Sequence, residues 1–411
     1  MAIFLGSPKD SPLAAGSLSA SPWAAPACQS QELKHFVTVV NIEVPVRVFK
    51  GGKFVDNLSL NEFEVYENGK PQKIEAIYLI KKTSIKKEEA STKVQLKPEV
   101  KKRHFVLIFE MDDYLPELNK VLDYFFKEVL ASEDTVWVAT PAGSIQLKKE
   151  ALDQMPREKI VEQLKTRLKR DIRQRALRLQ SLIEDLKRLA TLQEISGMWG
   201  QEIMVENIAQ QIADLKMLDE PRIAEFAGTL RKMEGQKHAF LFYQKEAFRI
   251  PAIYLKILRE FERKDYIDQV KIQRLYADAS TSIHFLFVTK TRADFKDPSF
   301  RESKDNAVVG QANAYDQDLS FASSGGSVVF EQGSGDFFSA FREIAVATGG
   351  LRESSSNPAF MFQKAVEASE NYYLLYYKPS DYKADGTYKE IEVKVKGGNY
   401  QITHRAGYIE R

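Results

Sequence analysis

The stretch that decides the fold is Arg103-His104-Phe105-Val106-Leu107-Ile108-Phe109-Glu110. Its centre is a short, continuous apolar run, which is typical of a parallel strand buried on both faces of a sheet. Similar runs follow at residues 135–139, 239–243 and 282–288, and stretches with helical periodicity separate them. Because apolar strands alternate with helices, the sequence predicts a doubly wound α/β sheet within residues 102–370.

A long helical insertion is predicted between the second and third of these strands, at residues 156–230. Apolar residues recur at spacings of three and four over residues 161–190, so this helix would be ~45–55 Å long at about 1.5 Å per residue. Gly197-Met198-Trp199-Gly200 can break it, and a second apolar stripe covers residues 205–215. We therefore expect an antiparallel, coiled-coil-like helical hairpin, with Pro221 at the end of its second helix.

The two ends of the chain predict strands of another kind. In residues 36–80, apolar and polar residues nearly alternate, which is the period of a half-buried strand. Asn68-Gly69 is a strong signal for a two-residue hairpin turn between Phe63–Tyr66 and Ile74–Leu79. The alternation returns in residues 371–411, and a two-stranded hairpin is only marginally stable by itself. We therefore expect the two ends to pair into one β-sandwich-like domain.

Three further segments have the composition of connections or tails. Residues 81–101 carry many lysines, which indicates a linker, and residues 290–335 are rich in Ser, Gly, Asn and Asp, which predicts a flexible loop. Residues 1–35 are either a disordered tail or the remnant of a secretory signal, because Ala25-Pro26-Ala27 before Cys28 is similar to a signal-peptidase site. The second alternative implies an extracytoplasmic location, periplasmic or secreted.

Composition narrows the class of protein. The 59 basic and 57 acidic residues nearly cancel, so no net field attracts the chain to nucleic acid, and no nucleic-acid partner is expected. The single cysteine excludes an intramolecular disulfide and a thiolate metal cluster. No apolar run approaches the ~18 residues that a membrane-spanning helix needs, so no transmembrane segment is expected.

Three stretches of the sequence resemble a known family. Residues 60–74 resemble the opening segment of the von Willebrand factor A-related family that is found mainly in acidobacteria, and residues 103–110 resemble the first strand of its domain. The tail resembles its closing strands, in residues 372–377, 388–395 and 404–408. This resemblance implies a Rossmann-like A domain with a metal-ion-dependent adhesion site, in which an Asp-x-Ser-x-Ser loop after the first strand holds a divalent cation.

This chain departs from the metal-binding pattern of the family. Glu110 stands where the family has Asp, and Asp112 and Tyr114 replace the two serines. After the third strand the family reads Ser-Asp-Gly, whereas Tyr243-Gln244-Lys245 stands here, and a lysine ammonium would repel a cation. Glu110, Asp112 and Asp113 remain the candidate ligands for Mg²⁺ or Ca²⁺, with Thr140 as a further hydroxyl donor; the alternative is a set of solvated carboxylates without a cofactor.

Catalytic motifs are missing from the sequence. The five histidines, at positions 35, 104, 238, 284 and 404, form no His-Glu-x-x-His pair, and no Gly-x-Ser-x-Gly motif supports a nucleophilic serine. His104, His238 and His284 lie at or within predicted strands, where we expect core or edge residues. We therefore predict that the chain is not an enzyme; the alternative is an enzyme whose site is assembled from residues that lie far apart in the sequence.

The first inserted helix is basic. Its basic residues are opposed only by Asp171, and they are Lys165, Arg167, Lys169, Arg170, Arg173, Arg175 and Arg178. Such a cluster is either the solvated face of a long helix or a surface for an acidic protein or a membrane. The leading hypothesis is a binding or scaffolding protein that engages a protein partner, or a second copy of itself, through the helical hairpin. The main alternative is a metal-dependent adhesion module that uses Glu110, Asp112 and Asp113.

Overall fold

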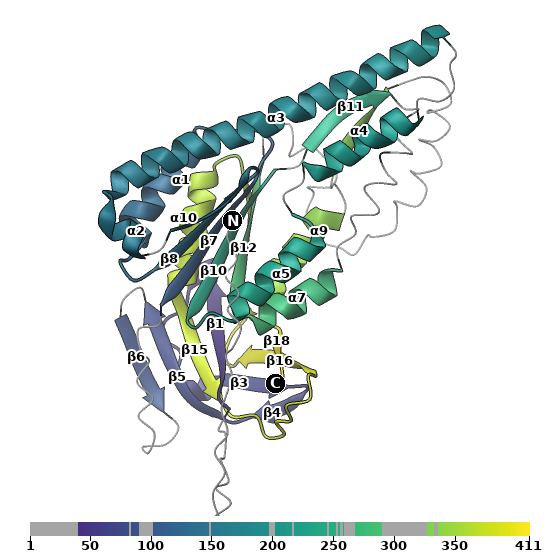
Figure 1. Ribbon diagram of the computed structural model, residues 1–411. Coiled ribbons are helices and arrows are strands. Elements are labelled where there is room, and N and C mark those ends of the chain that lie inside the picture. The colour runs from purple at the N-terminus through teal and green to yellow at the C-terminus, as the bar shows by residue number, and fades with distance from the viewer. Residues whose placement is uncertain are drawn as a thin grey trace, which may run out of the picture. The chain divides into compact units, whose positions relative to one another are not determined.

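The structure is a computed structural model (Figure 1). It describes residues 40–81, 84–89, 102–147, 149–196, 202–215, 218–244, 246–251, 254, 258, 268–289, 327–332 and 336–411. The predicted tail at residues 1–35 and the glycines expected to break the long helix lie outside these residues. No helix in the described ranges has the length and the apolar character that crossing a membrane requires.

The central sheet has the strand order β14-β12-β10-β7-β8-β9. Neighbouring strands are parallel, except that β9 runs antiparallel to β8. Numbered by position in the chain, the order from β9 to β14 is 3-2-1-4-5-6, and it changes direction between β7 and β10. In α/β sheets such a switch point is where ligands bind, beyond the carboxyl ends of the strands. The strands are β7 (Arg103–Glu110), β8 (Thr135–Thr140), β9 (Gly143–Leu147), β10 (Gln236–Tyr243), β12 (Thr281–Val288) and β14 (Arg352–Ser355).

Helices cover both faces of this sheet (Figure 1). Phe105, Leu107 and Phe109 of β7 share one core with α1 (Glu117–Tyr124), the π-helical turn η2 (Phe125–Val129), α2 (Lys149–Gln154) and α10 (Pro358–Glu370). Val106 shares the opposite core with α5 (Glu220–Arg231), α7 (Gln269–Asp278) and α9 (Asp336–Ala347). The alternation of buried side chains along β7 therefore builds a three-layer α/β/α domain.

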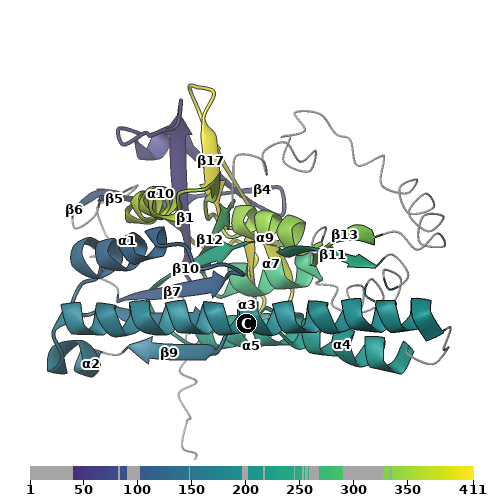
Figure 2. The same cartoon turned by 90° about the horizontal axis from the view of Figure 1, so that it is seen from above.

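One 40-residue helix, α3 (Arg157–Ser196), belongs to two cores in turn. Leu164, Leu168 and Ile172 in its first half pack into the core on the α1 side of the sheet. Leu182 and Leu186 in its second half pack instead against α4 (Glu202–Asp214). Figures 1 and 2 show α1 beside the first half of α3 and α4 beside the second.

The helical segment begins at Arg157 and ends at Arg231, close to the predicted 156–230, but its two ends belong to the α/β domain and not to a hairpin. The first half of α3 is part of the α/β domain, and α5 covers its sheet through Ile223, Ala227 and Leu230. Pro221 begins α5 rather than ending the helix before it, because proline needs no backbone donor in a first turn, and the Asp219 side chain caps the amide of Arg222.

The two chain ends form two further sheets that share one core. Strand β1 pairs with β15 and β17, and β3 pairs with β16, so strands distant in sequence lie side by side. Their shared core includes Val44, Val65 and Tyr373. The strands are β1 (Ile42–Lys50), β2 (Lys53–Phe54), β3 (Phe63–Glu67), β4 (Lys70–Gln72), β5 (Ile74–Lys81), β6 (Ser84–Glu89), β15 (Asn371–Tyr377), β16 (Tyr388–Val395), β17 (Gln401–His404) and β18 (Gly407–Ile409).

Three local expectations need correction. Asn68 and Gly69 do form a tight turn, with φ of 47° and 76°, but β3 pairs through it with the short β4, whereas β5 crosses to the other sheet. The predicted linker contains β6, which lengthens that sheet as an edge strand. The predicted flexible loop contains β13 (Ser327–Gln332), which pairs with β11 (Glu246–Pro251); its other residues lie outside the described ranges.

A buried arginine joins the β domain to the α/β domain. Arg47 of β1 is 2% exposed, and its guanidinium donates hydrogen bonds to the carbonyl oxygens of Ala368 and Gly349. Burial lowers the pKa of Arg47 to about 10. Beside it, the Ala406 amide donates to the Ala347 carbonyl at 2.7 Å. These contacts fix the end of α10 and the turn after α9 against the β domain.

Candidate functional site

The carboxyl ends of β7 and β10 meet at the switch point of the sheet. Met111 and Asp112 follow β7 and are buried, whereas Asp113 is exposed. The Asp113 amide donates to the side-chain oxygen of Gln244, which follows β10, at 2.9 Å. The acids predicted from the sequence thus lie at the edge of the sheet where a ligand is expected.

A buried ion pair occupies this edge. An Nη of Arg175, from the middle of α3, lies 2.6 Å from a carboxylate oxygen of Glu110, and the two side chains are only 7% and 6% exposed. The same guanidinium donates to the Met111 carbonyl at 3.1 Å. A charge pair with so little water around it is held by close geometry and by the additional hydrogen bond. Arg175 therefore supplies the positive charge at the strand end.

A second buried carboxylate lies next to this pair. The hydroxyl of Thr140, at the end of β8, donates to Asp171 of α3 at 2.7 Å. Asp171 is 1% exposed, and it also lies 3.1 Å from Arg170 and 3.4 Å from Arg167. The Thr140 hydroxyl thus fixes α3 to β8.

The metal-ion site that the family resemblance implies does not fit these donors. Glu110 faces the Arg175 guanidinium, and the Thr140 hydroxyl is engaged by Asp171. A divalent cation beside Glu110 would be repelled by the guanidinium. No group of three or more His, Cys, Asp or Glu side chains suited to a metal ion occurs within the described ranges. Lys245, which the sequence placed beside the site, lies outside them.

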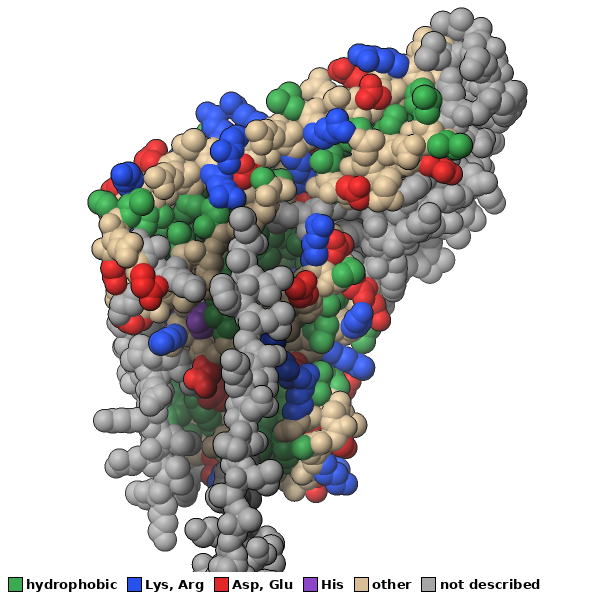
Figure 3. Space-filling view, in the orientation of Figure 1, with side chains coloured by type: hydrophobic (Ala, Val, Ile, Leu, Met, Phe, Trp, Pro, Cys, Tyr) green, Lys and Arg blue, Asp and Glu red, His purple; other side chains and the backbone are tan. Residues whose placement is uncertain are grey.

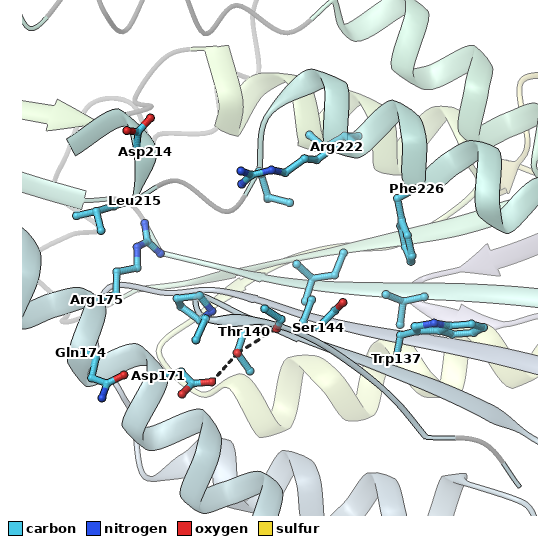
Figure 4. Close-up of a pocket in the computed structure, with 18 of the residues that line it drawn as sticks. Trp137, Thr140, Ser144, Asp171, Gln174, Arg175, Asp214, Leu215, Arg222 and Phe226 are labelled. Atoms are coloured by element: carbon cyan, nitrogen blue, oxygen red, sulfur yellow. Dashed lines mark hydrogen bonds between the residues drawn. The ribbon is translucent and has the colours of Figure 1, made fainter. Parts of the chain in front are cut away.

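A cavity of about 710 Å³ adjoins the ion pair. Its floor is the face of β7 and β8 that carries Ile108, Trp137 and Ala139, and its walls come from the turn after β8, from α3, from the end of α4 and from α5. Figure 4 shows Arg175 and Asp171 at one end and Trp137 below Phe226 at the other. A volume of this size is in the range of pockets that hold small organic ligands.

No family model matches this chain, and neither a curated protein nor a solved structure does. Function is therefore inferred from the geometry and chemistry of specific residues, since a fold alone carries many functions. Among these residues the structure brings together Glu110, Asp171 and Arg175, although Glu110 and Arg175 lie 65 positions apart in the sequence.

The basic residues of α3 do not form the single solvated face that the sequence indicates. Arg175 is buried against Glu110, which corrects its assignment to an exposed partner surface. Arg167 and Arg170 face the buried Asp171, and Lys165 lies 2.7 Å from both Asp123 and Glu162. The others point elsewhere: Lys169 lies over the Tyr114 ring, Arg178 donates to Gln211, and Arg173 is exposed. In Figure 3 acidic side chains lie among the basic ones along α3.

Three of the described histidines lie within the central sheet. His104, His238 and His284 are buried within the sheet, as the sequence indicates. Burial lowers the pKa of His238 to about 3 and places that of His284 well below its usual value. Both rings are therefore neutral near pH 7 and stack on phenylalanines, His238 on Phe105 and His284 on Phe240. His35 lies outside the described residues.

Sequence reasoning missed the cavity and the Glu110–Arg175 pair. A signal for the cavity is present in β8, where Trp137 stands between buried valines and faces the less covered side of the sheet. The ion pair has no comparable signal, because its partners come from a strand and from a helix whose position over the sheet depends on tertiary packing. The sequence showed only the basic character of the helix and the presence of Glu110 where the resembling family has Asp.

Proposed function

We propose that this chain is a non-enzymatic binding protein, in which a von Willebrand factor A-like domain serves as a rigid platform and the hairpin of α3 and α4 engages a protein partner or a second copy of the chain. The strand order 3-2-1-4-5-6, with its antiparallel edge strand, supports the proposal that this domain is a platform. It is the order of a doubly wound fold, with helices on both faces. We also propose a location outside the cytoplasm, which the similarity of Ala25-Pro26-Ala27 to a signal-peptidase site supports.

The continuity of α3 is the observation that carries this proposal. Its first half is buried in the core of the α/β domain, and Arg175 and Asp171 fix its middle to the carboxyl ends of β7 and β8. The second half continues without a break and holds α4 through Leu182 and Leu186. A helix anchored along half its length presents the other half in a fixed orientation, which reduces the entropy lost when a partner binds.

The hairpin buries its own apolar stripe and still exposes large apolar side chains. Val205 and Ile212 of α4 are buried against α3, so the stripe itself does not need a second chain. Leu177, Ile203 and Met204 nevertheless remain 66%, 70% and 57% exposed. Side chains of this kind on a rigid helical surface are suited to contact a partner protein.

Recognition is proposed to proceed without a metal ion. The guanidinium of Arg175 already neutralises Glu110, so cation binding at this edge would require an ion to displace a buried partner. Calorimetric titration of the full chain with Mg²⁺, Mn²⁺ or Ca²⁺ should give no binding heat at millimolar metal. Saturable heat that is lost in an Asp112→Asn variant would support the metal-dependent alternative.

The test of the hairpin compares two matched surface changes. An Ile203→Glu/Met204→Glu variant places charge on α4, and a Phe360→Glu variant places charge on another exposed apolar residue, which is 48% exposed on α10. Partners are cross-linked to each form in the native organism, and self-association is measured by light scattering. We expect the α4 variant to lose a partner or a dimer that wild type and Phe360→Glu retain. Equal capture and equal mass for all three forms would contradict the proposal.

A further inference from the structure

The cavity exists because one part of the sheet is only partly covered. Strand β12 is buried along its whole length, and β10 is buried from Lys237 to Tyr243, whereas in β8 every second residue is only partly buried. The partly buried residues of β8 include Trp137 and Ala139, on the side of α5. Ile223 and Phe226 of α5 line the space beside this face of the sheet, and α3 crosses above that space. An indole therefore faces a hollow instead of a packed helix.

The two ends of the cavity differ in chemistry. One end is apolar, and Figure 4 shows the Phe226 ring above the indole of Trp137 there. The other end is polar, with Arg175 and Asp214 drawn on the side of α3 and α4, and Arg222 reaching inward from α5. A ligand that fills the cavity along its length needs an apolar body and a polar group at one end.

Arg178 is the guanidinium at the polar end that is suited to an anion, because Arg175 faces Glu110 and Arg222 lies 3.2 Å from Asp219. Asp214, at the same end, accepts a hydrogen bond from the Gln210 side-chain amide at 2.8 Å. Asp171 is already engaged by Thr140, Arg167 and Arg170, so its negative charge is balanced within the protein. Arg178 donates to the side-chain oxygen of Gln211, which is a neutral acceptor, so this contact does not cancel its charge. Guanidinium groups bind carboxylates and sulfonates through paired, charge-assisted hydrogen bonds.

We propose that this cavity binds an amphiphilic organic anion, an apolar chain or ring that carries one acidic group. The apolar body lies on Trp137 between β8 and α5, and the acidic group lies at Arg178 of α3. Aromatic rings supply apolar contact, and the guanidinium fixes the orientation. The cavity does not include Ile203 or Met204, the residues changed in the hairpin test, so a failed test here leaves the partner-binding proposal open, and the reverse also holds.

Trp137 supplies a direct readout. In a Trp23→Phe/Trp199→Phe background it is the only tryptophan of the chain. The probe is 8-anilinonaphthalene-1-sulfonate, an aromatic sulfonate, titrated into the full chain while energy transfer from the indole is recorded. Dodecanoate, dodecanol and dodecyltrimethylammonium then compete. We expect dodecanoate to displace the probe at concentrations about tenfold lower than the two compounds without an anionic group, the ratio that one charge-assisted hydrogen bond supports.

Two variants locate the site, and a third serves as the control. Ala139→Phe fills the floor of the cavity, and Arg178→Glu reverses a charge at its polar end; Arg188→Glu reverses an exposed charge on the same helix outside the cavity. We expect at least about tenfold weaker probe binding for the first two and unchanged binding for Arg188→Glu. Thermal unfolding identifies any variant that fails to fold. If Ala139→Phe does not fold, Arg178→Glu still tests the site, because the Arg178 side chain is exposed.

The proposal is overturned by either of two outcomes. Probe binding that is equal in wild type, Arg178→Glu and Arg188→Glu would show that the dye binds elsewhere. Displacement by dodecyltrimethylammonium at the same concentration as by dodecanoate would show that the cavity does not select an anion.

Discussion

The Arg175 guanidinium neutralises a carboxylate that has little contact with water, so the free energy of unfolding depends on both partners. An Arg175→Met change leaves Glu110 as a buried charge without this partner. We expect it to lower the unfolding free energy by about 3–5 kcal/mol, and we expect the double change Glu110→Gln/Arg175→Met to recover most of this loss. Urea denaturation at pH 7 measures both values.

The control for the ion pair is Arg188→Met on the same helix, because the Arg188 side chain is 74% exposed and its 3.6 Å contact with Asp185 lies at the surface. Its unfolding free energy should stay within about 0.5 kcal/mol of wild type. A double change as unstable as Arg175→Met alone would show that Arg175 acts through its packing and its bond to Met111 rather than through the charge of Glu110.

His238 makes stability depend on pH in the acidic range. In the folded protein its pKa is about 3, because burial disfavours the imidazolium, whereas an unfolded histidine titrates near the usual 6.5. As the pH falls from 6.5 towards 3, the unfolded state binds a proton that the folded state does not. Stability is therefore lost in this window, by at most ~1.4 kcal/mol per pH unit for each such histidine. The lowered pKa of His284 acts in the same direction.

The contribution of His238 is isolated by a His238→Phe variant. Its Nδ1 has no hydrogen-bond partner among the described residues, and phenylalanine keeps a ring that can stack on Phe105. Unfolding free energies at pH 7.5, 6 and 5 should fall less steeply in the variant, by up to ~1.4 kcal/mol per pH unit. Parallel curves for the two proteins would mean that His238 binds protons equally in the folded and unfolded states.

At the scale of elements, the two halves of α3 should respond differently to the same change. Leu168 and Leu186 are both buried, but they belong to the core of the α/β domain and to the hairpin core, respectively. Leu168→Ala should lower the global unfolding free energy by about 2–5 kcal/mol. Leu186→Ala should instead speed amide hydrogen exchange in α4 and leave β7 and β10 protected. Equal loss of protection in β7 for both variants would show that α3 and the sheet unfold as one unit.

The elements themselves follow from sequence patterns, and their assignment to domains follows only in part. The apolar runs predicted the strands β7, β8, β10 and β12, because a strand buried on both faces needs no polar residues. The apolar stripe of α3 predicted a helix and its buried side. It did not identify what the stripe is buried against, since a stripe that packs on a sheet and one that packs on a helix have the same period. For this reason the predicted helical insertion, 156–230, includes α5.

In the whole molecule, Arg47 couples the β domain to the α/β domain. An Arg47→Met change leaves the carbonyl oxygens of Ala368 and Gly349 without their donor in a buried place. We expect a loss of about 1–3 kcal/mol for each carbonyl and a calorimetric enthalpy that exceeds the van't Hoff enthalpy, because the domains then unfold separately. The control is Arg352→Met, an exposed arginine of β14. A single two-state transition in Arg47→Met would contradict this coupling role.

The sequence by itself determined the strand and helix patterns and the α/β class of the central domain, because these depend on residue types and on their local spacing. Only the tertiary structure decided that Arg175 reaches Glu110, that Trp137 faces a cavity and that α3 is anchored along half its length. Ion pairs and cavities of this kind are formed by residues of different elements. The distances between those residues depend on how the elements pack, which local periodicity does not specify.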